Sequence, residues 1–476
     1  NVTEEAGHAL ARAICRVLAD PNATVTLSYS MRDLVDDKLQ FPSASMLELF
    51  RVTEDNDKAH VEDLQLYLGP PVAFVSQTVD DHLSKTDSLL AKLLTEPDRQ
   101  ENEEFLDEHF KYRPYQRLAI AAGKEATLTP YDGIIPNAGI DLSLTKTHVV
   151  SPSRLEMYGT CPRRFFFSYG LGVRAPDELV VDQEQWLDPL QFGSLVHHLF
   201  EEFLRELTVR DQTPVVKRDR ELLLSHLQDK LQSLEKTIPA PNQDCYRRTT
   251  QKLRDTCQIF LEKEEEYCKA FNARPWVLEA SIGMGGNPKS DLETPDPVPL
   301  ELSDGRIIHV RGMLDRVDKL MTAGSETYAI WDYKSGSSYG FSKDSPFNQG
   351  RKLQPYLYLG MLRHRIKACG EDQDAVQSFG YFFPSPRTDG LRLQWTAAEL
   401  QGGDDILMAI SNLIADGVFV PTTNSADCTY CDYLSVCGDP NVVTETGVFK
   451  AMQPNTPVLE PWRMLREISN DSELQS

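Results

Sequence analysis

The chain has 476 residues, of which 41% are hydrophobic, so it is long enough for roughly three domains of about 150 residues with a sizeable buried core. No apolar run approaches the roughly 20 residues of a membrane-spanning helix, and the N-terminus lacks the basic and apolar stretches of a secretory signal. We therefore expect a soluble, cytoplasmic protein. The net charge of -23 argues against a nucleic-acid partner, although phosphate binding depends on local charge and metal-binding carboxylates add to the negative total.

Residues 1–148 carry few candidate catalytic side chains. The hydrophobic pattern predicts an amphipathic helix over 9–18, a buried strand over 23–29 and several further helices. No Gly-x-x-x-x-Gly-Lys-Ser/Thr phosphate loop occurs in the sequence, so nothing indicates nucleotide hydrolysis. Because the first residue is Asn1 and a helix-like pattern follows at once, we expect the chain to be part of a longer polypeptide.

The character of the sequence changes at Val149. Ser151 is a typical helix N-cap and Pro152 suits the first helical position, so we expect a helix that leads toward Cys161. Two arginines and a run of phenylalanines follow shortly after the cysteine. By itself, Cys161 is most simply a small buried side chain.

The next helical run extends over Gln191–Phe203 and has one apolar side. Gly193 and His197 lie one turn apart in it, so the glycine allows a neighbour to approach beneath the imidazole. A single histidine near an apolar helix face is usually a core residue with a hydrogen-bond partner. Metal ligation is the alternative.

Two further long helices are followed by predicted strands. The first of these strands, over 276–283, contains Glu279. Asp304-Gly305 between two apolar runs is a strong β-hairpin signal. Short strands follow over 311–318 and 330–336, and we expect the hairpin to lead directly into the first of them.

The densest group of candidate catalytic residues lies on these last two strands. Side chains alternate along a strand, so Asp332 and Lys334 share one face while Tyr333 points to the other. If the neighbouring strand brings Asp315 alongside, two carboxylates can hold a divalent cation, and Lys334 can orient or help to deprotonate a water. This is the minimal set for metal-assisted phosphodiester hydrolysis, although many exposed strands carry an Asp-x-Lys triplet without any catalytic role.

A helix over 352–361 follows, with Gln354 and Tyr358 one turn apart on one face. Packing is the simplest interpretation of both side chains. Beyond this helix the pattern predicts a strand over 376–383, a second strand, and a helix over 398–415 that leads to the last cysteines.

Three cysteines, Cys428, Cys431 and Cys437, lie close together near the C-terminus. Cysteines in a cytoplasmic chain are expected to be reduced, so a tight group indicates a metal or iron-sulfur site rather than disulfides. Three thiolates leave a four-ligand site incomplete, and Cys161 is the natural fourth. Zinc and iron-sulfur clusters both accept four thiolates, so the spacing does not separate them. The remaining cysteines are interpreted as packing residues: Cys15, Cys245, Cys257, Cys268 and Cys369.

Taken in order, these residues resemble the PD-(D/E)XK nuclease superfamily, in particular its RecB/AddB-type branch with a four-cysteine iron-sulfur staple. The resemblance covers about residues 149–476. No single motif is specific, whereas the ordered set is. The motifs that carry it are Cys161, Gly193-x-x-x-His197, Gly312-x-x-Asp315, Asp332-x-Lys334, Gln354-x-x-x-Tyr358, and Cys428-x-x-Cys431 with Cys437.

The resemblance implies an α/β fold with a restriction-endonuclease-like core, in which helices flank a mixed central sheet. It implies that Mg2+ or Mn2+ is the catalytic metal and that the cysteines hold a 4Fe-4S cluster. Lys334 would be catalytic, Gln354 and Tyr358 would support the site and the DNA, and Glu279 fits the family's first-strand acidic position. The implied metal ligands are His197, Asp315, Asp332 and the main chain of Tyr333, and the implied cluster ligands are Cys161, Cys428, Cys431 and Cys437.

The same resemblance implies a deoxyribonuclease, expected to act as an exonuclease, in a helicase-nuclease complex for double-strand-break repair and recombination. Its partners would be DNA and an AddA-like helicase subunit, with no membrane. Residues 1–148 then resemble the remnant of a helicase-like scaffold, and residues 149–476 form the nuclease domain. Two alternatives stay open: a CRISPR-adaptation-type nuclease, and a non-catalytic DNA-binding module with a structural four-cysteine zinc site.

Overall fold

The computed structural model describes residues 12–13, 15–16, 19, 26–32, 39–72, 84–95, 99–136, 142–144, 148–175, 184–286, 288, 290–322, 324–453 and 456–467. The chain divides into two compact units, Asn1–Glu125 with Asp177–Glu184, and Ala126–Pro176 with Gln185–Ser476. Within the described ranges, no helix is both long enough and apolar enough to cross a bilayer.

The regular elements described in the first unit are helices. Ser43 caps its first described helix, because its hydroxyl oxygen accepts a hydrogen bond from the N–H of Met46 at 3.2 Å. The predicted helix over 9–18 lies largely outside the described residues, and residues 26–29 of the predicted strand have no regular structure. The helices are α2 (Ala44–Thr53), α3 (Val61–Leu68), α4 (Lys85–Thr95), α5 (Arg99–His109) and α6 (Arg113–Gly123).

The second unit is built on a five-stranded sheet of order β2-β5-β6-β7-β8. Strands β6 and β7 are parallel and the other neighbours are antiparallel, so the sheet is mixed. Two parallel strands cannot be joined by a tight turn, and α12 (Gln354–Ala368) lies in the connection between them. The strands are β2 (Ala273–Ile282), β5 (Gly312–Thr322), β6 (Ser325–Tyr333), β7 (Val376–Phe383) and β8 (Leu391–Thr396).

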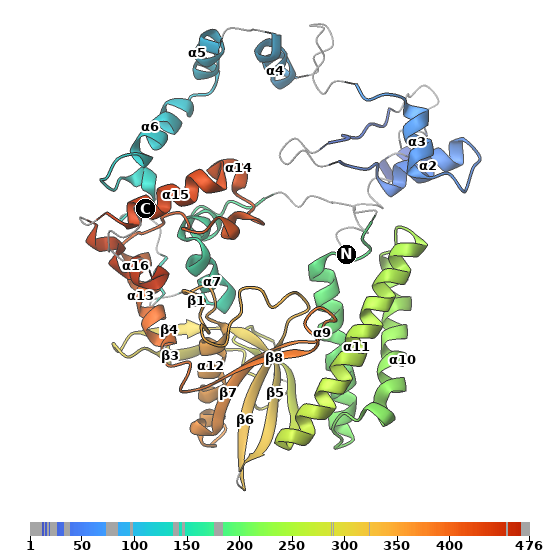
Figure 1. The fold of residues 1–476 in the computed structure, drawn as a ribbon, viewed down its shortest axis with the longest axis vertical. Coiled ribbons are helices and arrows are strands. Elements are labelled where there is room, and N and C mark those ends of the chain that lie inside the picture. The colour runs from blue at the N-terminus through green and yellow to red at the C-terminus, as the bar shows by residue number, and fades with distance from the viewer. Residues whose placement is uncertain are drawn as a thin grey trace, which may run out of the picture. The chain divides into compact units, whose positions relative to one another are not determined.

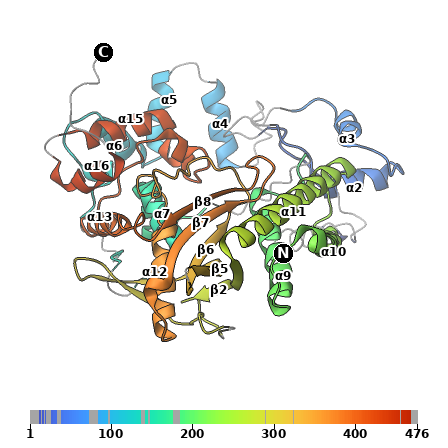
Figure 2. The same ribbon diagram turned by 60° about the horizontal axis from the view of Figure 1, so that its bottom comes forward.

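Helices cover both faces of this sheet, which confirms the predicted fold class (Figures 1 and 2). On one face lie α9 (Pro189–Val209) and α11 (Gln243–Phe271), with α10 (Val216–Thr237) packed against both. The rings of Phe200 and Phe260 stack with centroids 3.6 Å apart and join α9 to α11. Two apolar cores result, one beneath these helices and one between the opposite face and α12.

A separate three-stranded sheet has the order β1-β4-β3. Its antiparallel pair β3 (Val298–Glu301) and β4 (Ile307–Val310) is the predicted hairpin, and β1 (Val149–Val150) runs parallel to β4. Arg311 alone separates β4 from β5, so the hairpin does lead into the strand of Asp315, although the two strands belong to different sheets. The strands predicted to be short have 11 residues in β5 and 9 in β6.

The remaining helices surround the second core. Ser151 caps the first of them, with its hydroxyl oxygen 3.3 Å from the N–H of Arg154, as predicted. The helix predicted from residue 398 begins only at Gly403, because residues 398–402 form turns. The helices are α7 (Pro152–Thr160), α8 (Pro162–Phe165), α13 (Gly403–Ala415), α14 (Leu434–Cys437), α15 (Pro440–Ala451) and α16 (Glu460–Arg466).

Candidate functional site

Three polar side chains from three elements converge at one end of the central sheet. His197 comes from α9, Glu279 from β2 and Asp315 from β5, and one ligand atom of each lies within 4.8 Å of the others. Nδ1 of His197 is 3.4 Å from Oδ2 of Asp315 and 3.9 Å from Oε1 of Glu279. Imidazole nitrogens and carboxylate oxygens are ligands of divalent cations, so this group is a candidate metal site.

The backbone at Glu279 is unusual for a strand residue. Its φ is 51°, in the left-handed region, where a residue other than glycine is strained. Its neighbours Leu278 and Ala280 pair with Arg316 and Leu314, which places Glu279 opposite Asp315 across the two strands. Two carboxylates in this position repel each other unless a cation lies between them.

A second group of side chains lies beside the first. Nζ of Lys334 is 2.6 Å from Oδ2 of Asp332, so the two side chains point to the same side of the chain as predicted. The strand itself is shorter than predicted, because β6 ends at Tyr333 and Lys334 follows it. Gln354, the first residue of α12, connects to both: its amide nitrogen donates to Oδ1 of Asp332, and its amide oxygen accepts from Lys334 at 3.3 Å. Tyr381 on β7 also donates its hydroxyl hydrogen to this oxygen at 3.3 Å. The carboxylate and ammonium groups are thus held by neutral partners on two other elements.

The main chain of Tyr333 lies between these two groups. Its N–H donates to Oδ2 of Asp315 at 2.9 Å, and its carbonyl oxygen is 3.0 Å from Nε2 of His197. A histidine that uses Nε2–H in this way leaves Nδ1 available as a ligand. The tyrosine ring points into the opposite layer, where it packs on Phe200 and Phe260. The predicted alternation of faces along this strand therefore holds.

Four charged side chains, three of them fully buried, support the layer beneath the Tyr333 ring. Arg316 donates to Asp318 at 2.6 and 2.9 Å and to the Tyr333 hydroxyl at 3.1 Å, and its Nη1 lies 2.7 Å from Glu264. Arg392 pairs with the other oxygen of Glu264. Arg316, Asp318 and Glu264 are fully buried, and two positive charges balance two negative ones. This network joins α11 to β5, β6 and β8.

The electrostatics of the site reflect crowded carboxylates. Burial, then Asp332 and Glu279, hold the pKa of Asp315 well above its ordinary value. Burial, then Glu201 and Asp332, raise the pKa of Glu279 to about 7. Burial lowers the pKa of His197. Each of these shifts disfavours the charged form of its group, and a bound divalent cation would relieve the repulsion among the carboxylates.

Tyr358, the last residue of the predicted set, is buried rather than exposed at the site. It lies on α12, and a Cβ added to Gly312 would come within 2.8 Å of its ring. The glycine of the Gly312-x-x-Asp315 motif therefore makes room for this tyrosine. Burial, and then the charge of Asp332, raise the pKa of Tyr358, whose side chain also interacts with that of Gln354.

Three features of the site are not among those expected from the sequence: Glu156, Tyr381 and the pair of Arg351 with Asp427. Glu156 lies in the helix expected after Ser151, and it accepts hydrogen bonds from the N–H groups at the start of α12. No signal in the sequence joins positions that far apart. Tyr381 sits in a strand that was predicted correctly, but its aromatic side chain looked like an ordinary core residue.

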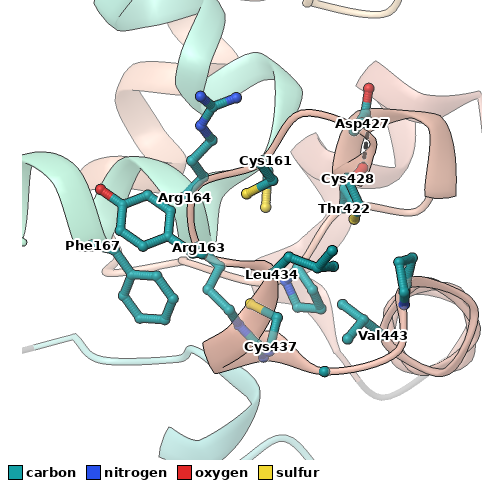
Figure 3. Close-up of a pocket in the computed structure, with 15 residues that line it drawn as sticks. Cys161, Arg163, Arg164, Phe167, Thr422, Asp427, Cys428, Leu434, Cys437 and Val443 are labelled. Carbon is teal, nitrogen blue, oxygen red and sulfur yellow. Dashed lines mark hydrogen bonds between the residues drawn. The ribbon is translucent and has the colours of Figure 1, made fainter. Parts of the chain in front are cut away.

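The four predicted cysteine ligands line one small pocket: Cys161, Cys428, Cys431 and Cys437. Figure 3 shows Cys161, Cys428 and Cys437 around this pocket, with Arg163 and Arg164 on its rim. Burial raises the pKa of Cys161 and Cys437 and, with the neighbouring thiols, raises that of Cys428 to about 11. The N–H groups of Arg164 and Thr422 point at the sulfur of Cys161 and favour its thiolate.

The five remaining cysteines divide into two kinds. Cys245, Cys257 and Cys268 are buried in the core beneath α11, in agreement with the packing interpretation. Cys15 and Cys369 are exposed, so that interpretation is wrong for them. The exposed Cys369 follows directly after the last residue of α12, where the chain leaves the core.

This chain is similar to a known protein family and to several curated proteins. The family model described as the PD-(D/E)XK nuclease superfamily matches residues 149–438. Curated proteins named as subunits of an ATP-dependent helicase/deoxyribonuclease are also similar. The one from Clostridium tetani is 26% identical over 60% of this chain and 24% of its own length. The one from Acetivibrio thermocellus is 30% identical over 45% of this chain and 18% of its own length. The chain thus spans no more than about a quarter of the length of these relatives.

Proposed function

The chain belongs to the PD-(D/E)XK nuclease superfamily, and on this premise we propose that it is a Mg2+- or Mn2+-dependent deoxyribonuclease. One observation carries the proposal. Ligand atoms of His197, Glu279 and Asp315 converge within 4.8 Å, directly beside the ion pair of Asp332 and Lys334. This set of donors fits a hard divalent cation with an ammonium group next to it.

In the proposed mechanism, His197 through Nδ1, Asp315 and Glu279 would hold the metal, with Asp332 and the carbonyl of Tyr333 as further ligands. When bound, a divalent cation would supply positive charge that polarises the scissile phosphate and lowers the pKa of a water. Lys334 orients that water and offsets the negative charge that develops on the phosphate. Gln354 keeps the carboxylate of Asp332 and the ammonium of Lys334 in place.

For the cysteines we propose a 4Fe-4S cluster rather than zinc. Four thiolates around one zinc ion, each about 2.3 Å from it, have sulfur atoms about 3.8 Å apart. Among these four described cysteines, no three sulfur atoms lie mutually within 4.8 Å, which favours a larger group. A brown protein with stoichiometric iron and sulfide after anaerobic purification would agree with the cluster. A colourless protein that contains zinc would contradict it.

The names of the relatives support a wider proposal about context. They are called helicase/deoxyribonuclease subunits, so we propose that this chain acts on DNA beside an AddA-like helicase subunit in double-strand-break repair and recombination. In this proposal residues 1–148 belong to a helicase-like scaffold, residues 149–476 are the nuclease domain, and the protein is cytoplasmic. An exonuclease would degrade end-labelled linear DNA and leave circular DNA intact.

The test compares variants in that DNA assay with Mg2+ or Mn2+ and with a chelator. Asp332→Ala and Lys334→Ala should abolish cleavage while the circular dichroism spectrum stays unchanged. His197→Ala should do the same, whereas its neighbour His198→Ala is a matched control, because that side chain is 66% exposed and lies outside the proposed ligand set. Undiminished cleavage by Asp332→Ala or Lys334→Ala would rule out this site.

A further inference from the structure

Residues 349–354, which lead into α12, are held from two directions by residues that neighbour the cysteines. On one side, Glu156 of α7 accepts hydrogen bonds from the backbone N–H groups of Leu353 and Gln354 at 2.7 and 2.9 Å. Cys161 directly follows α7 as its C-cap residue, so one helix carries both the carboxylate and the thiol. Cys161 and Glu156 are therefore connected through the backbone of α7.

On the other side, Arg351 forms a bidentate ion pair with Asp427. The carboxylate lies 3.0 Å from Nε and 2.8 Å from Nη2, and each side chain is only 9% exposed. Asp427 directly precedes Cys428 and lines the same pocket (Figure 3). A bidentate pair fixes orientation as well as distance, so it links Arg351 to the residue that directly precedes Cys428.

The backbone of α7 also lies directly against this segment. A Cβ added at Gly159 would collide with the carbonyl oxygen of Gly350. Arg466 bridges the two chain segments, because it donates to the carbonyl oxygens of Gln349 at 2.9 Å and Thr160 at 3.0 Å. The segment therefore has little room to shift independently of α7.

The other end of the segment reaches the proposed catalytic pair. Gln354 is the first residue of α12, and its side chain contacts both Asp332 and Lys334. The first N–H groups of a helix have no partner within the helix. Glu156 supplies an acceptor for two N–H groups there, and its negative charge suits the N-terminus of a helix.

We propose that residues 349–354 couple the four-cysteine site to the catalytic pair, with Glu156 and Arg351 as positioning residues. This inference rests on the proposed nuclease function. Glu156 fixes the position of the first turn of α12 relative to α7. Arg351 fixes the orientation of the same segment relative to Asp427 and the adjacent Cys428. Disturbing either contact displaces Gln354 and with it the carboxylate of Asp332, although neither positioning residue touches the metal site.

The variants Glu156→Ala and Arg351→Ala test the proposal in the full 476-residue chain. Each should lower kcat by about 10- to 100-fold and weaken Mn2+ binding by a similar factor, as changes behind a metal ligand do. KM for DNA and the iron content should stay unchanged. Glu235→Ala and Arg387→Ala, which each remove one exposed charge of the same sign, control for the change in net charge alone. Calorimetry with Mn2+ alone gives a readout that does not depend on cleavage.

Conservative variants separate positioning from a general loss of stability. Glu156→Gln keeps an acceptor oxygen for both N–H groups, so its kcat should stay within about threefold of wild type. Arg351→Lys cannot form the bidentate pair and should resemble Arg351→Ala. The combined variant Glu156→Ala with Gln354→Ala should lose no more activity than Gln354→Ala alone, because both changes act through one side chain.

Three results would overturn the coupling. They are a Glu156→Ala variant with wild-type kcat and Mn2+ affinity, additive losses in the combined variant, and an Arg351→Lys variant with full activity. If Glu156→Ala fails to fold, the Arg351→Lys result still decides. Wild-type protein that cleaves no DNA with either metal would instead refute the proposed function, so the two failures are distinguishable.

Discussion

Replacement of Glu264 by glutamine tests how far the buried charges beneath Tyr333 stabilise the second unit. Glu264 and Asp318 are fully buried and balance the guanidinium groups of Arg316 and Arg392. Glutamine has nearly the same size and shape as glutamate. The substitution therefore leaves the packing intact and leaves one positive charge without compensation.

The structure sets the size of the expected effect. Removing one partner of a buried ion pair costs about 3–5 kcal/mol. Arg316 keeps its hydrogen bonds to Asp318 at 2.6 and 2.9 Å, and Arg392 keeps its contacts with the rings of Tyr267, Trp331 and Phe382. We therefore expect the lower end of that range, about 3 kcal/mol, which is a large part of the about 5–15 kcal/mol that stabilises a typical domain.

Urea unfolding followed by tryptophan fluorescence measures this loss. Glu262→Gln on the exposed side of the same helix is the control and should change stability by less than about 0.5 kcal/mol. Adding Arg392→Met to Glu264→Gln restores neutrality and keeps an apolar side chain against the rings, so the double variant should be more stable than the single one. A double variant that is no more stable would refute the charge-balance reasoning.

The pH dependence is a second check on the same residue. Burial raises the pKa of Glu264, but Arg316 and Arg392 outweigh burial and hold it below the ordinary value of 4.5. A carboxylate with a lowered pKa stabilises the fold above its unfolded-state pKa and loses that contribution as the pH falls through its folded-state pKa. The stability difference between wild type and Glu264→Gln should stay constant from about pH 7 to pH 5 and shrink only below pH 4.5.

Three further predictions concern other parts of the unit. Gly380→Ala should lower the free energy of unfolding of the second unit by about 1–3 kcal/mol, measured in urea, because the added Cβ would collide with the Trp331 ring. Gly336→Ala is the control and should leave stability unchanged, because a Cβ there has open space. Asp188→Ala should cost about 1 kcal/mol, because its carboxylate caps α9 by accepting from Gln191 N–H at 2.8 Å; an unchanged unfolding midpoint would argue against the cap. Cys161→Ser should abolish iron binding and lower the free energy of unfolding by up to about 5–6 kcal/mol, because a cluster shared with Cys428 closes a loop of 428 − 161 = 267 residues. A Cys369→Ser variant, which changes an exposed cysteine, is the control. Equal iron content in the two variants would contradict the prediction.

Several features of this protein follow from short stretches of sequence. The period of two along 330–336 predicted that Asp332 and Lys334 share a face and that Tyr333 does not, and the structure agrees. Ser151 marked the start of α7, and Asp304-Gly305 marked a hairpin. The cysteine spacing indicated one site, and the four side chains line one pocket. These features depend on local backbone geometry, which a few neighbouring residues determine.

Only the tertiary structure decided which distant residues meet. It placed the strained Glu279 opposite Asp315, put the hairpin in a sheet of its own, and brought Glu156 to the start of α12. It also showed that Cys369, which looked like a packing residue, is exposed. Such contacts arise when whole helices and sheets pack to bury their apolar faces, and polar groups far apart in the chain are then paired because an unpaired buried group is costly.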